Sequence, residues 1–207
     1  MTETALPALI QQMLQPGFYP HPVTEPIQLV QTHISYILLT GDYAYKVKKP
    51  VNYGFLDFST LEKREHFCHE EIRLNQRGAA DLYLEVLPIT ETAGQFRLGG
   101  SAEAVEFTVR MEQFPEGTLF TDLFDQGKLT AELLVRLAKE LVSFHQKGAI
   151  NDYIRSFGDV AQIRQAIDEN YDQTVGYIGR SQTQAQFDET RQYTDRLFAE
   201  KADLFTT

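Results

Sequence analysis

The chain has a single cysteine and no long apolar run. Cys68 has no partner for a disulfide within the 207 residues, so we expect a protein adapted to a reducing compartment. No apolar stretch approaches the roughly 20 residues that span a bilayer. The N-terminal segment MTETALPALIQQ also lacks the basic stretch and apolar core of a secretory signal. We therefore expect a cytoplasmic protein with no membrane contact.

An excess of positive charge is missing as well. Nineteen Lys and Arg residues face 29 Asp and Glu residues, which gives a formal net charge of −10. Nucleic acids and anionic membranes require a basic face, so we expect neither as a partner. Against this background the cluster Lys46, Lys48 and Lys49 is either a group of solvated charges or part of an anion site.

The length and the ordinary composition predict one domain or two closely joined lobes that need no disulfide or metal. Apolar and polar residues alternate with a period of two through much of the first half, which predicts antiparallel strands. The expected strands are residues 27–30, 34–39, 43–48, 83–89, 95–98 and 105–111. In the third of these, Tyr45 and Val47 share one face, while Ala44, Lys46 and Lys48 share the other.

Helical signals interrupt these strands and then replace them. The sequence Ser-Thr-Leu-Glu at 59–62 is a capping-box pattern that would open a helix ending near Gly78. After the break at 114–117 we expect helices only, with a strong apolar stripe over 133–144 and further helices at about 159–177 and 184–204. The predicted fold is α+β, with a small antiparallel-sheet lobe at 1–113 and a helical lobe at 114–207.

One acid of the first long helix points toward its apolar side. At 100° per residue, Glu71 falls in the middle of the apolar arc, whereas Glu70 falls opposite. A carboxylate on a packing face requires a cationic partner. Arg64 on the same helix is one candidate, and Lys46 or Lys48 on the preceding strand is the other.

A strand lysine held by a helix glutamate is the arrangement with which a kinase-type lobe binds nucleotide phosphates. The order of strands and helices also fits such a lobe. The connector Met111-Glu112-Gln113-Phe114 would then be a hinge whose backbone groups hydrogen-bond an adenine edge. The alternative for this connector is a plain turn from strand to helix.

Two long passages resemble bacterial aminoglycoside phosphotransferase-like proteins, whose fold is similar to that of choline kinases and protein kinases. They are THISYILLTGDYAYKVKKPVNYGFLDFSTLEKREHFCHEEIRLNQRGAADLYLEVLPIT and VEFTVRMEQFPEGTLFTDLF. More narrowly, the sequence resembles the group in which such a domain often precedes a P-loop kinase-like ATPase domain. The resemblance runs from about Leu9 to Phe205.

The resemblance implies a set of site residues and a cofactor. Lys46 matches the phosphate-binding lysine of the third strand, with Lys48 as the alternative, and Glu71 matches its partner. Thr32, His33 and Ser35 fall where a nucleotide-covering loop would lie, although no Gly-x-Gly-x-x-Gly sequence is present there. The implied cofactor is ATP with Mg²⁺, and the implied substrate is a small hydroxylated molecule.

The sequence departs from this family at the catalytic centre. The family takes its catalytic aspartate from a His-Gly-Asp-type loop and its metal ligands from a later asparagine and aspartate, and no such loop occurs here. We therefore expect either part of a longer phosphotransferase or a truncated relative, with self-association through unpaired helix faces. The alternative function is a kinase-fold binding or regulatory module without catalysis, which acts with a fused or separate P-loop ATPase partner.

Two weaker candidates lie on the helix that carries Glu71. His66, His69 and Glu70 share its outer face, and a solvated surface is the favoured interpretation over a metal site. Cys68 lies on the inner face, where we expect a small core residue rather than a reactive thiol.

Overall fold

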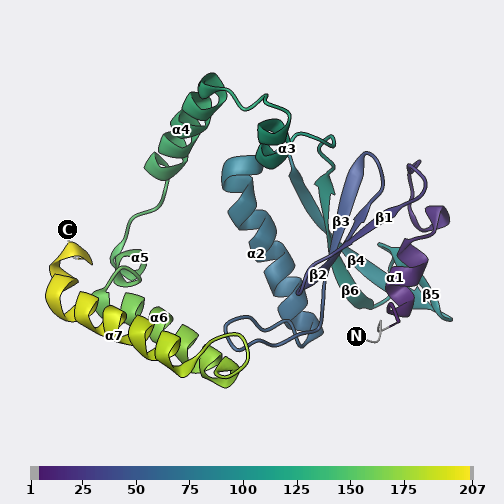
Figure 1. Cartoon of the computed structure of the whole chain (residues 1–207). Coiled ribbons are helices and arrows are strands. Elements are labelled where there is room, and N and C mark those ends of the chain that lie inside the picture. Colours follow the sequence, from purple (N-terminus) through teal and green to yellow (C-terminus); the bar gives the residue numbers. More distant parts are fainter. Residues whose placement is uncertain (1–4, 206–207) are drawn as a thin grey trace. The chain divides into compact units, whose positions relative to one another are not determined.

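The computed structural model describes residues 5–205. They form two compact units, and the division along the chain falls between Phe144 and His145. Figure 1 shows the elements along the chain. The first unit contains the whole sheet, together with three helices and most of a fourth. The division into compact units places the first helices after the sheet in the same unit as the strands. The predicted lobe boundary at 113/114 therefore stays a prediction.

The sheet of the first unit has six antiparallel strands in the order β1-β2-β3-β6-β4-β5. Their bounds are β1 Gln28–Gln31, β2 Ser35–Leu39, β3 Tyr43–Lys48, β4 Tyr83–Thr92, β5 Gln95–Leu98 and β6 Ala104–Glu112. The strands expected from the alternating pattern are thus confirmed, and the first three form a meander. The last strand, β6, lies between β3 and β4.

Helix α2, Leu61–Ala79, connects the two strand groups and begins one residue later than predicted. Thr60 caps it, because its hydroxyl accepts a hydrogen bond from the Lys63 amide at 3.3 Å. The expected capping box starting at Ser59 is wrong. The Ser59 hydroxyl instead donates to the Asp57 carboxylate at 2.6 Å, so it is not available to the helix.

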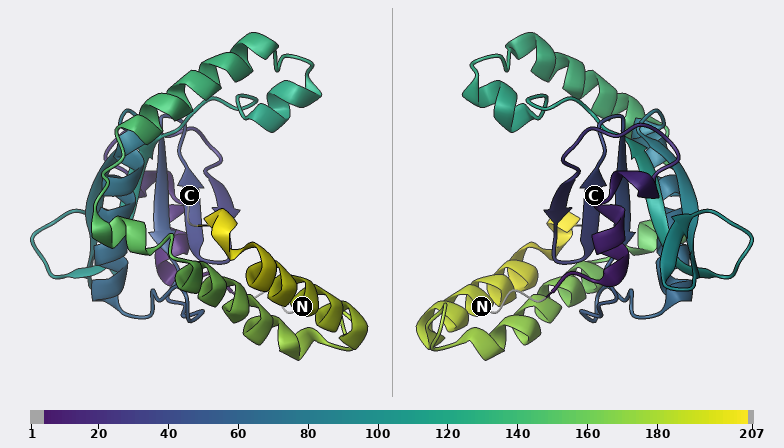
Figure 2. Two further views of the ribbon diagram at one scale, coloured as in Figure 1. Left: turned by 90° about the vertical axis from the view of Figure 1, so that its left-hand side faces the viewer. Right: turned by 90° about the vertical axis from the view of Figure 1, so that its right-hand side faces the viewer.

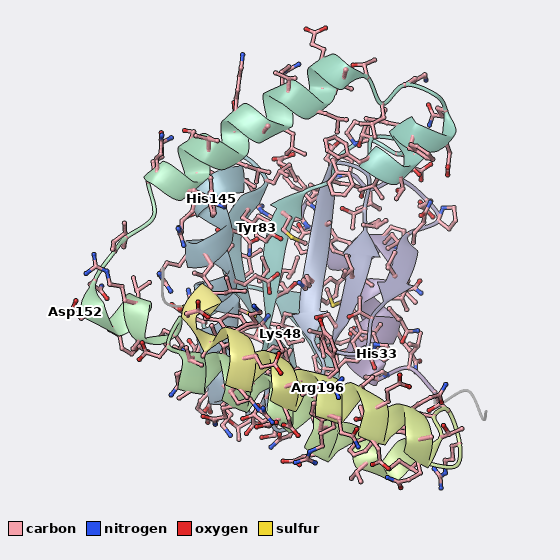
Figure 3. The ribbon with its side chains drawn as sticks, turned by 60° about the vertical axis from the view of Figure 1, so that its left-hand side comes forward. His33, Lys48, Tyr83, His145, Asp152 and Arg196 are labelled. Atoms are coloured by element: carbon pink, nitrogen blue, oxygen red, sulfur yellow. The ribbon has the colours of Figure 1, made fainter. Side chains whose placement is uncertain are left out.

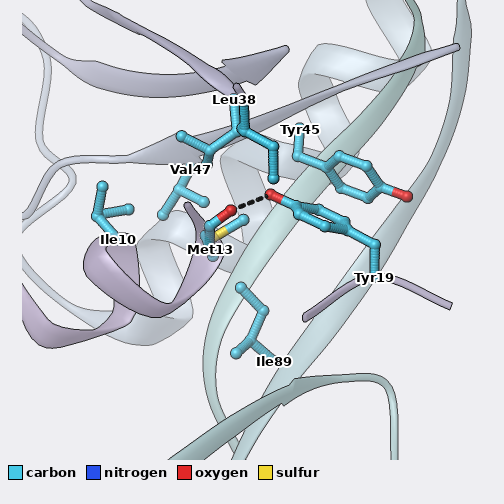
Figure 4. Packing of buried hydrophobic residues seen from close by; sticks show 8 residues of the cluster. Ile10, Met13, Tyr19, Leu38, Tyr45, Val47 and Ile89 are labelled. Atoms are coloured by element: carbon cyan, nitrogen blue, oxygen red, sulfur yellow. Dashed lines mark hydrogen bonds between the residues drawn. The ribbon is translucent and has the colours of Figure 1, made fainter. Parts of the chain in front are cut away.

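The two faces of the sheet carry separate apolar clusters, beneath α1 (Ala8–Met13) on one side and α2 on the other (Figures 1 and 2). On the first face the Tyr19 hydroxyl donates to the Met13 carbonyl at 2.7 Å (Figure 4). The buried members of this cluster are Ile10, Met13, Tyr19, Ile27, Leu38, Tyr45, Val47 and Ile89. As predicted, Tyr45 and Val47 therefore face away from the lysines of the same strand.

The face beneath α2 has a smaller apolar cluster. Cys68 of the helix packs against Phe107 and Val109 of β6. Phe67 and Leu74, which the helical arc places at the edge of the packing face, are 37% and 46% exposed, so the buried stripe of α2 is narrower than predicted. Charged side chains also join α2 to the sheet, in ion pairs of Glu71 and Arg64 with residues of the strands.

The helices after the sheet are α3 Phe120–Asp125, α4 Ala131–Gln146, α5 Asp152–Ser156, α6 Val160–Thr174 and α7 Gln184–Lys201. The three long helices were predicted, and the short α3 and α5 were not. Short 3₁₀ turns follow α1, α6 and α7 at Pro16–Phe18, Val175–Tyr177 and Ala202–Phe205. In the second unit α6 and α7 are joined by Arg164, which pairs with Asp168 and Asp195. None of the helices within residues 5–205 has the length and apolar character required to cross a membrane.

Candidate functional site

Glu71 is paired with both lysines of β3. Lys46 Nζ lies 2.6 Å from Glu71 Oε1, and Lys48 Nζ lies 2.6 Å from Glu71 Oε2. The side chain of Lys48, labelled in Figure 3, comes from the last residue of β3. The prediction that a strand lysine neutralises Glu71 is confirmed. The sequence predicted one lysine partner for Glu71, whereas the structure has two. Each carboxylate oxygen of Glu71 accepts a hydrogen bond from a different lysine.

The backbone geometry explains why these three side chains meet. Alternate residues of a strand point to the same face, so Lys46 and Lys48 both point toward α2. On the helix, Glu71 lies three residues after the buried Cys68, which places the two side chains on one face. Glu70 lies on the outer side and pairs with Arg73 at 2.7 Å.

The three charged groups differ in burial. The side chains of Lys46, Glu71 and Lys48 are 24%, 12% and 5% exposed. Lys48 Nζ also lies 4.7 Å from the centroid of the Phe58 ring, a cation–π contact. Lys46 is therefore the lysine that a ligand can reach, and Lys48 lies in the protein interior.

The electrostatics of this cluster favour an anion. Burial alone would raise the pKa of Glu71, but hydrogen bonds from Lys46 and Lys48 and their charges outweigh it, so the pKa is lowered. Glu71 is thus ionised at neutral pH. Two lysines and one carboxylate leave a net charge of one positive unit (2 − 1) in a chain whose formal net charge is −10.

Arg64, the alternative partner for Glu71, is bound elsewhere. Its Nε–H donates to both carboxylate oxygens of Glu106 at 2.9 Å, and its Nη1 donates to the Phe58 carbonyl at 3.0 Å. Sequence reasoning missed Glu106 entirely. Because Arg64 and Glu106 neutralise each other, the positive charge at Lys46 and Lys48 is not cancelled.

A cavity of about 640 Å³ opens beside Lys46 in the first unit. Lys46 lines it, whereas Lys48 and Glu71 do not. Its apolar walls come from β2, β3 and the end of β6, and all four residues of the predicted hinge, Met111, Glu112, Gln113 and Phe114, line it as well. The strand register explains the arrangement, since Ala44 lies opposite both Leu39 and Met111 and directly opposite residues share a face.

Only some of the backbone N–H groups of the connector, residues 111–114, donate hydrogen bonds within the described part of the protein. The Glu112 amide donates to the Leu82 carbonyl and the Gln113 amide donates to the Asp42 carbonyl, both at 2.9 Å. The Phe114 amide has no hydrogen-bond partner among residues 5–205. Pro115, which follows, has no N–H group. Phe114 lines the cavity, and its N–H has no acceptor within the described residues.

The predicted nucleotide-covering loop does not line this cavity. The Thr32 hydroxyl accepts from the Ser35 amide at 3.0 Å, and the Lys49 ammonium donates to the Thr32 carbonyl at 2.7 Å. His33 is exposed. Ser35 is buried opposite Lys48, and its hydroxyl has no partner within the described part of the chain. A role of Thr32, His33 and Ser35 in covering a nucleotide stays a prediction.

The described residues do not fit a resident metal. Within residues 5–205 no group of three or more His, Cys, Asp and Glu side chains is arranged to hold a metal ion. His66 packs against the edge of the Phe67 ring, with 5.1 Å between centroids.

Comparison with known proteins identifies long relatives. An uncharacterized protein of Mycobacterium tuberculosis and an uncharacterized protein of Mycobacterium bovis are each 36% identical to the chain over 152 residues. The match covers 72% of this chain and 29% of each relative, so the chain spans less than a third of their length. No family model matches the sequence. No solved structure matches the fold.

Proposed function

We propose that this chain binds ATP, as the nucleotide-binding portion of an aminoglycoside phosphotransferase-like small-molecule kinase with a protein-kinase-like fold. One observation carries the proposal: Lys46 both pairs with Glu71 and lines the cavity beside the connector. A lysine fixed by a carboxylate at the end of an apolar cavity is suited to the phosphates of a nucleotide.

The cavity supplies the other contacts that a nucleotide needs. Its volume of about 640 Å³ lies within the range of about 300–1,000 Å³ that small-molecule pockets have. The side chains of Ala44, Leu39 and Met111 form apolar walls for a flat ring. The Phe114 N–H is a donor for a ring nitrogen, and Lys46 supplies positive charge for the phosphates.

The proposal assigns nucleotide binding, and not phosphoryl transfer, to the residues described. Transfer needs a metal and a residue that orients the acceptor hydroxyl. Neither the His-Gly-Asp-type loop nor a metal-binding group is found within residues 5–205. A small hydroxylated substrate is the acceptor that the whole enzyme would use.

This gap favours a second candidate function. A kinase-fold module could bind a nucleotide without catalysis and act with a fused or separate P-loop ATPase partner. The two candidates differ in turnover: a kinase built from this portion transfers the γ-phosphate to a hydroxyl, whereas a regulatory module changes the ATPase rate of its partner and transfers nothing.

Thermal unfolding with and without Mg-ATP tests the common part of both candidates. A ligand at one hundred times its Kd stabilises a protein by about 2.7 kcal/mol, so saturating ATP should raise the melting temperature. Lys46→Ala should remove the shift. Lys63→Ala, which removes an exposed lysine paired with Asp57, should keep it. An unchanged wild-type curve at millimolar ATP refutes nucleotide binding, and loss of the shift in Lys48→Ala but not in Lys46→Ala reverses the choice of lysine.

A further inference from the structure

We propose that Lys48 is a positioning residue that retains Glu71, so that Lys46 can turn toward an anion in the cavity. This inference rests on the proposed function and deepens it. It explains why the site contains two lysines for one carboxylate, where a single pair would be enough to neutralise Glu71.

The two lysines are placed for different tasks. Lys46 lines the cavity and is 24% exposed, so its ammonium can contact both Glu71 and a ligand. Lys48 is 5% exposed, does not line the cavity and contacts the Phe58 ring. Because Lys48 is buried and does not line the cavity, it is a poor direct ligand for phosphate, and its burial fixes it beside Glu71.

The two oxygens of Glu71 make the division possible. Lys46 binds Oε1 and Lys48 binds Oε2, so neither lysine competes with the other for one oxygen. A buried carboxylate that loses its only cation is strongly destabilised, because its charge remains without compensation. With Lys48 on Oε2, Glu71 stays neutralised when Lys46 leaves Oε1. The free energy needed to release Lys46 is therefore lower than it would be in a lone pair.

The same arrangement sets the charge that a ligand meets. With Lys48 present, the cluster has one positive charge in excess. Without it, Lys46 and Glu71 cancel, and a phosphate has to compete with Glu71 for the only lysine. Adenosine, which has no phosphate, does not enter this competition. Lys48 should therefore affect ATP and leave adenosine unaffected.

Calorimetric titration of the full chain with ATP and with adenosine tests the inference in four variants beside wild type. Lys48→Met should weaken ATP by about tenfold and change adenosine by less than about twofold, since the lost charge acts on phosphate alone. Lys48→Arg, which keeps a donor for Glu71, should bind ATP within about threefold of wild type. Lys63→Met, the matched control, should bind both ligands as wild type does.

The fourth variant separates positioning from other roles. In Lys48→Met with Glu71→Gln, the carboxylate that would hold Lys46 has lost its charge, so ATP affinity should return to within about threefold of wild type. A lysine that only stabilises the fold predicts no recovery.

Each result has a definite meaning. The inference is overturned if Lys48→Met binds ATP as wild type does, if it loses ATP and adenosine equally, or if the double variant does not recover. Should Lys48→Met not fold, a selective loss of ATP in Lys48→Arg overturns it too. If wild type binds neither ligand, the proposed function itself fails, which is a different outcome from any of these.

Discussion

The guanidinium of Arg64 donates through Nε to both carboxylate oxygens of Glu106, at 2.9 Å each, although the two residues lie 42 positions apart in the chain. The pair joins α2 to β6, and the side chains are only 10% and 11% exposed. Glu106 Oε1 also accepts from the Phe107 amide at 3.0 Å. The pair therefore holds the helix that carries Glu71 against the centre of the sheet.

Removing one partner of this pair should destabilise the fold strongly. Glu106→Ala leaves the Arg64 guanidinium buried without a counter-charge, a change that costs about 3–5 kcal/mol in other buried pairs. Chemical denaturation with urea measures the loss. Replacing both residues in Arg64→Met with Glu106→Met should recover much of it, because no uncompensated charge remains. A Glu106→Ala variant as stable as wild type would show that the pair does not hold α2.

The acid stability of the protein should depend on Glu71. Its pKa is lowered in the folded state below the ordinary glutamate value of about 4.5, so its ionised form stabilises the fold above about pH 4.5. That contribution is lost as the pH falls through the folded pKa, where the carboxyl becomes protonated. Glu71→Gln should therefore be less stable than wild type at neutral pH, and the difference should shrink below pH 4.5. A difference that stays constant from pH 7 to pH 3 would contradict this assignment.

The cavity beside Lys46 should be closed by a larger side chain at Ala44. This residue is 6% exposed and lines the cavity between Leu39 and Met111. Ala44→Leu places the added carbons where a ring would bind, so ATP and adenosine should both weaken by about tenfold or more, which is about 1.4 kcal/mol. Lys46→Ala should weaken ATP alone. Unchanged adenosine binding in a folded Ala44→Leu variant would place the ligand elsewhere.

Gly41, in the turn between β2 and β3, should not tolerate a side chain. Its φ of +106° disfavours other residues, and a Cβ atom there would lie 2.4 Å from Thr24 Oγ1 and 3.1 Å from Thr24 Cβ. Gly41→Ala should destabilise the protein by about 1–3 kcal/mol. Gly54→Ala is the matched control, since its φ is also positive but nothing lies within 4 Å. Equal melting temperatures for the two variants would contradict the steric argument.

The parts of the fold that follow from local periodicity could be predicted from the sequence. The strand β3 was found with its exact bounds because its residue types alternate along the chain, with Tyr45 and Val47 buried on the face opposite to the lysines. Glu71 could be distinguished from Glu70 because consecutive residues of a helix are rotated by about 100°, which separates a packing position from a solvated one. Each of these two patterns is formed by residues that lie close together in the sequence, so it can be recognised without knowledge of the fold.

Features that depend on long-range register could not be predicted. Strict alternation in β6 places Glu106 on the face opposite to Phe107 and Val109, yet its carboxylate reaches Arg64 on α2. The register between β4 and β6 shifts at Ile89/Thr90, next to Glu106, and no local pattern reveals this irregularity. The greater burial of Lys48 over Lys46 could not be predicted either, because both lysines occupy equivalent positions in the alternating pattern.

Short elements were missed for a different reason. The helices α3 and α5 have six and five residues, too few for a repeating apolar face to be recognised. The connector residues 111–114 were predicted as a hinge from the order of the elements. They line the cavity, and their role as a hinge that contacts a nucleotide stays a prediction.

The position of β6 has a consequence for how the chain folds. This strand is the last of the six in sequence, yet it is inserted between β3 and β4. Without β6, the strands β1-β2-β3 and β4-β5 share no strand pairing, and each group has an inner edge of unpaired backbone groups. The pairing of β3 with β6 joins residues far apart in the sequence, and such long-range pairing slows folding. Because Lys46 is paired with Val109 in this pairing, the candidate anion site depends on the contact that joins the two groups of strands.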